Sequence, residues 1–222
     1  SSTKDLESKT AGSVAIQTQF KLWMSEAAQA SVNDSVIGYH QSSNGLEWIQ
    51  LVEKGLMTAC FAYQITDNYL TDNKIGSNVN NTTPEAGDAY TDMEHHWDEG
   101  YGYFADNNNY DSSSNRYWTK YANKSYMNGL GAEIATAFRT GRAAIHASRT
   151  ANDGNGLRFH ADVLAQRDIV VAKMYRLTAG MAIHYLLDTK AKVAANVGVP
   201  TPVNSDNKIM HSLSEAYAFI YG

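Results

Sequence analysis

Residues 158–193 read RFHADVLAQRDIVVAKMYRLTAGMAIHYLLDTKAKV, and this stretch predicts an all-α fold. Strand signals are scarce here and elsewhere, because no run of alternating β-branched residues is bounded by tight turns. Apolar residues instead recur at helical spacings, which indicates a long helix with one buried face. The stripe predicted to face the core comprises Val163, Val170, Met174, Leu177, Met181 and Leu187.

Helical patterns also cover most of the remaining chain. Asn44 is a candidate N-cap for the second helix, and Asn128-Gly129 should interrupt the fourth. The two longest predicted loops are polar, asparagine-containing stretches at residues 71–87 and 105–115, the latter rich in asparagine and serine. The predicted helices cover residues 13–31, 46–70, 88–104, 117–148, 158–193 and 208–221.

These elements predict how the chain is organised. No linker separates two cores, and no repeat of fixed period is present. We therefore expect a single helical bundle of about six helices, forming one domain over residues 1–222. Residues 1–12 are expected to form a polar N-terminal segment.

Composition excludes several classes of function. Of the 222 residues, 43% are hydrophobic and 18% are charged, and the formal net charge is −5. An acidic protein without a basic cluster is not expected to bind nucleic acid. No apolar run approaches the roughly 20 residues of a membrane span, so no transmembrane segment is predicted. The low charge and the many neutral polar residues favour a periplasmic or cell-surface location.

The densest group of candidate functional residues lies on the predicted helix 88–104. Residues three and four apart share a helix face, so one side presents imidazoles beside carboxylates. A histidine followed by a glutamate three positions on can hold one metal ion, which makes His96 and Glu99 the first candidate ligands. His95, Asp92 and Glu94 are alternates. The predicted ligand is a divalent metal or iron.

Other candidates would act around this cluster. Arg142 lies among small and apolar residues, where pairing with a carboxylate is expected, and Gly141 would allow a close helix approach. His211 and Glu215 are four apart on the last predicted helix and repeat the pairing of an imidazole with an acid. If that helix packs against helix 88–104, they would complete the site from a second shell.

Several segments together resemble an uncharacterised family of bacterial secreted or lipid-anchored helical domains, domain of unknown function 4856. The most specific is Met93-Glu94-His95-His96-Trp97-Asp98-Glu99. The resemblance implies a lipoprotein signal before Ser1 and an extension after Gly222. The supporting segments are residues 44–57, 102–104, 141–145 and 212–220.

The chain is also similar, more distantly, to imelysin-like proteins. Their signature is Gly-x-His-x-x-Glu, of which His96 and Glu99 match the second half, while Glu94 stands at the glycine position. This resemblance implies a helical bundle in the bacterial envelope, linked to iron uptake or to binding of metals and acidic polysaccharide.

Three hypotheses follow. The first is an envelope protein that binds a metal, most plausibly iron, or a metal-bearing molecule. The second is a glycan- or peptide-binding surface protein, an accessory to an outer-membrane importer, with Tyr110, Tyr117 and Trp118 lining a groove away from His96. The third is a structural or assembly subunit whose Glu94, His95 and Asp98 are buried and fully partnered. An enzyme is least favoured, because no nucleophile or cofactor motif accompanies the histidines.

Overall fold

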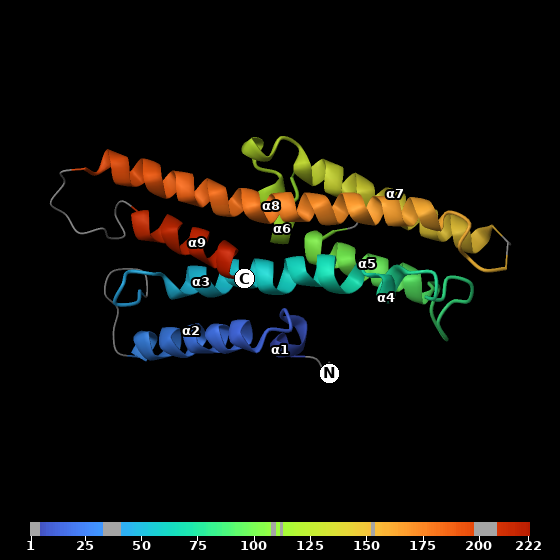
Figure 1. Ribbon diagram of the computed structural model, residues 1–222, viewed down its shortest axis with the longest axis horizontal. Coiled ribbons are helices and arrows are strands. Elements are labelled where there is room, and N and C mark those ends of the chain that lie inside the picture. The colour runs from blue at the N-terminus through green and yellow to red at the C-terminus, as the bar shows by residue number, and fades with distance from the viewer. Residues whose placement is uncertain (1–4, 33–40, 108–109, 112, 152–153, 198–207) are drawn as a thin grey trace. The chain divides into compact units, whose positions relative to one another are not determined.

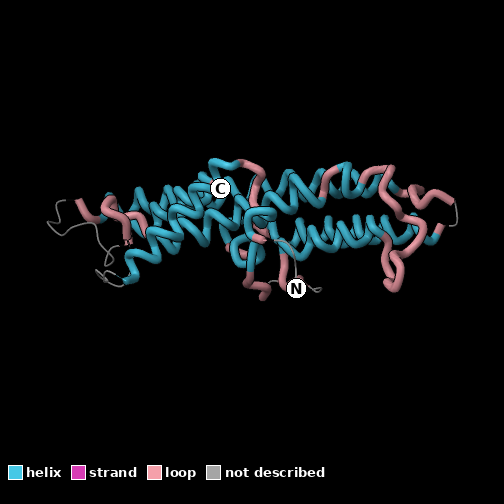
Figure 2. Tube along the Cα trace, turned by 90° about the horizontal axis from the view of Figure 1, so that it is seen from below, coloured by secondary structure: helices cyan, strands magenta, loops and turns pink. Residues whose placement is uncertain are grey.

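The computed structural model describes residues 5–32, 41–107, 110–111, 113–151, 154–197 and 208–222. Within these ranges the protein is all-α, as predicted, and Figures 1 and 2 show helices joined by loops. The only β-type pairing in the described chain is an isolated bridge between Gln41 and Glu47. The α-helices are α1 (Leu6–Lys9), α2 (Val14–Val32), α3 (Trp48–Leu56), α4 (Asp72–Ile75), α5 (Asp92–Phe104), α6 (Tyr117–Ala122), α7 (Leu130–Thr150), α8 (His160–Ala195) and α9 (Ile209–Tyr221).

The six predicted helices are present, with α1 and α4 as short additions. The interruption near residue 128 is confirmed, since Asn128 and Gly129 both have left-handed backbone angles, with φ of 51° and 79°. A 3₁₀ turn, η3 (Ser125–Met127), precedes them. Between the last two predicted helices, residues 198–207 lie outside the described residues.

The second predicted helix differs in two respects. Glu47, not Asn44, is the N-cap of α3. After Leu56 the chain continues as two π-helical segments, η1 (Met57–Ala62) and η2 (Gln64–Tyr69). The sequence analysis did not reveal this change, because it considered one α-helical period over the whole segment and π-helical turns are rare.

The described chain divides into two compact units. The first unit comprises residues 1–60 and 178–222, and the second comprises residues 61–177, so the boundaries fall inside η1 and α8. Compactness does not show that either unit folds alone, and the expected single domain therefore stays a prediction.

The first unit is built around α2, α3 and α9, which lie side by side in Figure 1. Phe20 and Trp23 of α2 pack with Leu51 of α3 and Ala218 of α9 in one apolar cluster. Gly55 permits this contact, since a Cβ atom there would lie 2.6 Å from the Phe20 ring.

The second unit packs α5 against η2, α4, α6 and α7. The α5–α7 contact is close because Gly141 of α7 leaves room for Trp97, as the sequence suggested. A Cβ atom at Gly141 would lie 2.1 Å from the indole ring. The indole Nε1 donates a hydrogen bond of 2.8 Å to the Phe138 carbonyl, which fixes the ring in place.

The buried stripe of α8 is confirmed from Val163 to Met181 but not at its end. Leu187 was predicted to face the core, and it is 59% exposed. The helical period continues the inward stripe through Tyr185 and Asp188, and these residues contact α9. The inward face of α8 thus changes from apolar to polar residues. Leu187 continues the apolar pattern of the sequence, but it lies on the exposed side of the helix.

Candidate functional site

Helix α5 begins with a capping box that the sequence contained but that was not used in placing its start. The Thr91 hydroxyl accepts from the Glu94 amide at 3.3 Å, and the Glu94 carboxylate accepts from the Thr91 amide at 3.0 Å. The helix therefore starts at Asp92 and not at residue 88. Its apolar face is buried, with Met93 and Trp97 each 1% exposed.

Glu94 is the centre of an ion-pair network between α5 and α7. Its carboxylate, 1% exposed, lies 2.9 Å from Arg142, 2.8 Å from Arg149 and 3.1 Å from His146 Nδ1. Burial alone would raise the pKa of Glu94. The Thr91 amide, His146 and the two arginines outweigh it and hold that pKa below its usual range. A carboxylate surrounded in this way has no open position for a metal ion.

Arg142 makes the carboxylate pairing that was expected of it. Its Nε lies 3.0 Å from both oxygens of Asp98, and its Nη1 bonds Glu94. Burial is the main cause that raises the pKa of Asp98, and Arg142 opposes it. Arg142 thus links two acids of α5 and does not serve as a second shell for His96.

His96 is engaged by Lys74 on the other side of α5. Its Nδ1 donates to the Lys74 carbonyl at 2.8 Å, and the Lys74 ammonium lies 3.3 Å from Nε2. Burial is the main cause that lowers the pKa of His96, which favours the neutral imidazole. In that state Nε2 is the acceptor for Lys74, so both ring nitrogens are occupied.

Three other predicted ligands share the exposed side of α5. His95 Nε2 lies 3.6 Å from the Glu99 carboxylate, and the His95 ring stacks on Tyr90. Asp92 interacts with Glu85, whose pKa is raised chiefly by partial burial and then by Asp92. Within the described ranges, no group of three His, Cys, Asp or Glu side chains is arranged to hold a metal ion.

The predicted second-shell residues His211 and Glu215 lie in the first unit, whereas His96 lies in the second. Helix α9 packs against α3, and His211 bonds Glu47 at 2.7 Å. A shared site required the last helix to pack against helix 88–104. The side chains of His211 and Glu215 are placed instead by the packing of α9 against α3.

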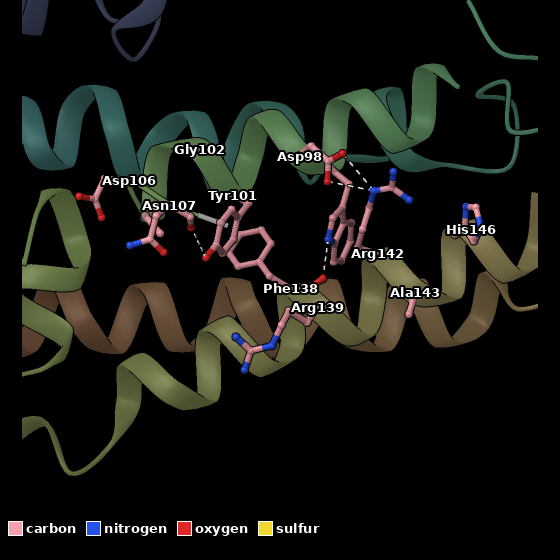
Figure 3. Close-up of a pocket in the computed structure, with 12 residues that line it drawn as sticks. Asp98, Tyr101, Gly102, Asp106, Asn107, Phe138, Arg139, Arg142, Ala143 and His146 are labelled. Carbon is pink, nitrogen blue, oxygen red and sulfur yellow. Dashed lines mark hydrogen bonds and ion pairs between the residues drawn. The ribbon is translucent and has the colours of Figure 1, made fainter. Parts of the chain in front are cut away.

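A cleft of about 750 Å³ lies between α5 and α7, and sequence reasoning missed it. Figure 3 shows Asp106 and Asn107 at one end and Arg142 and His146 at the other, with Tyr101 and Phe138 between them. Arg139, Arg142 and His146 follow each other at helical spacing on α7, and this pattern could have indicated a charged face.

Tyr101 is held in a defined orientation at the middle of the cleft. Its hydroxyl donates to the Asn107 carbonyl at 2.8 Å, and its ring meets Phe138 edge-on at 5.4 Å between centroids. Burial is the main cause that raises the pKa of Tyr101. The half-buried ring therefore presents a fixed apolar surface with little entropy left to lose on binding.

Groups that can donate or accept hydrogen bonds lie on both sides of the Tyr101 ring. In the part of the chain that the structure describes, Arg139 has no carboxylate within ion-pair distance, and its one hydrogen bond goes to Thr136 at 3.4 Å. His146 uses Nδ1 on Glu94, which leaves Nε2 for a ligand. Asp106 and the Asn107 side chain supply acceptors at the other end.

The aromatic residues predicted to line a groove lie elsewhere. Trp118 is fully buried, Tyr117 packs on Phe61, and Tyr110 bonds Asn123 and stacks on Phe104. None of the three lines the cleft between α5 and α7.

The fold and the cleft together define an all-α protein with a cleft of mixed aromatic and charged lining. The chain belongs to the family described as domain of unknown function DUF4856, whose model matches residues 2–222. No curated protein and no solved structure matches it. None of the described helices is long and apolar enough to cross a membrane.

Proposed function

We propose that the protein binds a sugar in the cleft between α5 and α7. The observation that carries this proposal is the fixed, half-buried ring of Tyr101 between a donor-rich end and an acceptor-rich end. Pyranose rings offer an apolar C–H face to an aromatic ring, and their hydroxyls need donors and acceptors around the rim. A volume of about 750 Å³ also suits a ligand of one to a few sugar units.

The charges of the cleft favour binding without catalysis. Asp98 has a raised pKa, as a general acid would, but both of its oxygens face the guanidinium of Arg142. The uncompensated charge of Arg139 suits a sugar that carries an acidic substituent. The third hypothesis, a subunit with no ligand site, fits less well, because the side chains of His95 and Asp98 are 40% and 54% exposed.

The test is a glycan array followed by calorimetry on the best ligand. Tyr101→Ala removes the ring and is expected to weaken binding at least about tenfold, since burying such a ring against a ligand contributes roughly 1.5–3 kcal/mol. Tyr126→Ala is the matched control, because Tyr126 is 43% exposed and lies outside the cleft. An array without hits for the intact protein would refute the proposal.

A second candidate is cation binding at the exposed side of α5, as part of metal or iron uptake in the cell envelope. It rests on the pairing of His95 with Glu99 and on the contact of Asp92 with Glu85, which would have to close around an ion, since they are not arranged to hold one in the described structure. Calorimetry with Fe²⁺, Fe³⁺ and Zn²⁺ should give heat that a His95→Ala/Glu99→Ala variant loses and a Glu133→Ala variant keeps. The absence of metal-dependent heat from the unaltered protein would exclude it.

Both proposals also imply a location in the cell envelope and a partner there. An envelope protein of either kind could deliver its ligand to an outer-membrane importer or hold a surface glycan. Fractionation of cells that produce the full-length protein tests the location directly.

A further inference from the structure

The acidic side chains that line the cleft between α5 and α7 already have cationic partners within the chain. Asp98 and Asp106 are the two acids of the lining. Arg142 holds both oxygens of Asp98 through hydrogen bonds of 3.0 Å. Arg116, which lies outside the lining, is 3.7 Å from Asp106. Neither acid therefore leaves a full negative charge for a ligand to neutralise.

The cations of the lining are not compensated in the same way, and Arg139 differs from its neighbours. Arg142 and His146 both contact the buried carboxylate of Glu94, at 2.9 Å and 3.1 Å. Arg139 has no such partner within ion-pair distance among the residues that the structure describes, and its hydrogen bond to Thr136 is long, at 3.4 Å. One positive charge on the wall of the cleft is thus left without an acid.

This charge lies close to the aromatic ring at the middle of the cleft. Figure 3 shows the Arg139 guanidinium extending away from Arg142 and His146. Burial is the main cause that raises the pKa of Tyr101, and the charge of Arg139 is the largest effect that opposes it. The guanidinium is therefore near the Tyr101 phenol, where it can reach a substituent at the edge of a ring stacked on Tyr101.

We propose that Arg139 makes the cleft selective for sugars that carry an oxoanion, a carboxylate or a sulfate, on the ring that stacks on Tyr101. This inference rests on the proposed function, because it requires a sugar in the cleft. A guanidinium presents a planar fork of N–H donors that matches the paired oxygens of an oxoanion. The net charge of −5 disfavours non-specific attraction of acidic sugars, so binding of such a sugar requires a local cation.

A glycan array with matched acidic and neutral members gives the first test. It contains galacturonate oligomers beside their methyl esters, and sulfated galactans beside the desulfated chains. The esters keep the size of the sugar and remove its charge, and the two series separate carboxylates from sulfates. The acidic member of a pair should bind about five- to tenfold more tightly, since one charge-assisted contact distinguishes the two. Added NaCl should weaken only the acidic member.

Calorimetry on the best acidic ligand and its neutral counterpart then tests the residue. Arg139→Gln should lose the five- to tenfold preference and leave the affinity for the neutral sugar unchanged. Arg139→Lys keeps the charge without the planar fork, so it should retain the salt dependence at an intermediate affinity. Arg158→Gln is the matched control, because Arg158 lies outside the lining and contacts the Phe159 ring.

The outcomes separate this inference from the proposed function. Neutral sugars that bind as tightly as their acidic counterparts would overturn the selectivity, while sugar binding in the cleft would stand. An acidic preference that survives Arg139→Gln would overturn the role of Arg139. An array without hits would refute sugar binding and the selectivity together.

Discussion

Among single residues, Glu94 has the contacts of a carboxylate that must stay ionised. Glu94→Gln keeps the shape but removes the charge that Arg142 and Arg149 face, and should destabilise the protein by about 2 kcal/mol at pH 7. The pKa of Glu94 is lowered on folding, so its stabilisation is present above the usual value of 4.5 and is lost as pH falls through the folded value. Urea unfolding at pH 7 and pH 3 should show the difference between the two proteins shrinking with acid.

The control for this prediction is Glu133→Gln, whose acid is half-exposed and pairs with Lys173. Little change is expected at either pH, because water screens such a pair. An equal effect of the two substitutions would show that the Glu94 network adds nothing beyond an ordinary surface pair.

For single residues, the sequence predicted the kind of contact that a side chain makes better than it predicted which residue that side chain contacts. The pairing of Arg142 with an acid was expected from its apolar neighbours, and it is present. The network around Glu94 was not expected, because two of its partners, Arg149 and His146, lie more than fifty positions further along the chain. The contacts of His96 were not foreseen either, because they come from Lys74, 22 positions earlier on another element.

Between elements, the distance of α5 from α7 depends on one glycine. Gly141→Ala would place a methyl group against the indole of Trp97, which its hydrogen bond to Phe138 holds in position. Overpacking should exceed the gain in helix propensity and give a net loss of about 1–2 kcal/mol in the free energy of unfolding. Denaturant unfolding of the variant and the unaltered protein measures this difference in the free energy of unfolding.

Gly102→Ala on the facing helix is the matched comparison. Gly102 is exposed and has no atom within 4 Å of the added methyl group. The same substitution should therefore stabilise α5 by about 0.5–1 kcal/mol. If both variants gained stability, helix propensity and not packing would decide the effect at Gly141.

The helices themselves could be predicted, because each needs only local periodicity. The errors of the prediction concern where a helix begins and which of its faces is buried. The start of α5 depends on the Thr91 cap, and the exposed position of Leu187 follows from polar residues that turn inward against α9. The π turns η1 and η2 were not expected, because such turns are rare.

For the whole molecule, the missing information is which helices pair. Helix α9 packs on α3 through residues more than 160 positions apart, and nothing in either segment alone specifies the other. This pairing places His211 and Glu215 beside Glu47, and the α5–α7 pairing creates the cleft. The sequence therefore indicated residues with functional chemistry, but the sites depend on tertiary contacts.

The two compact units give a last prediction about cooperativity. Gly55→Ala pushes a methyl group against Phe20 in the core of the first unit, as Gly141→Ala does against Trp97 in the second. Because local stability follows local packing, each variant should lower hydrogen-exchange protection first in its own unit. Gly55→Ala should affect α2, α3 and α9, and Gly141→Ala should affect α5 and α7. Equal loss across both units in both variants would instead support the single cooperative domain expected from the sequence.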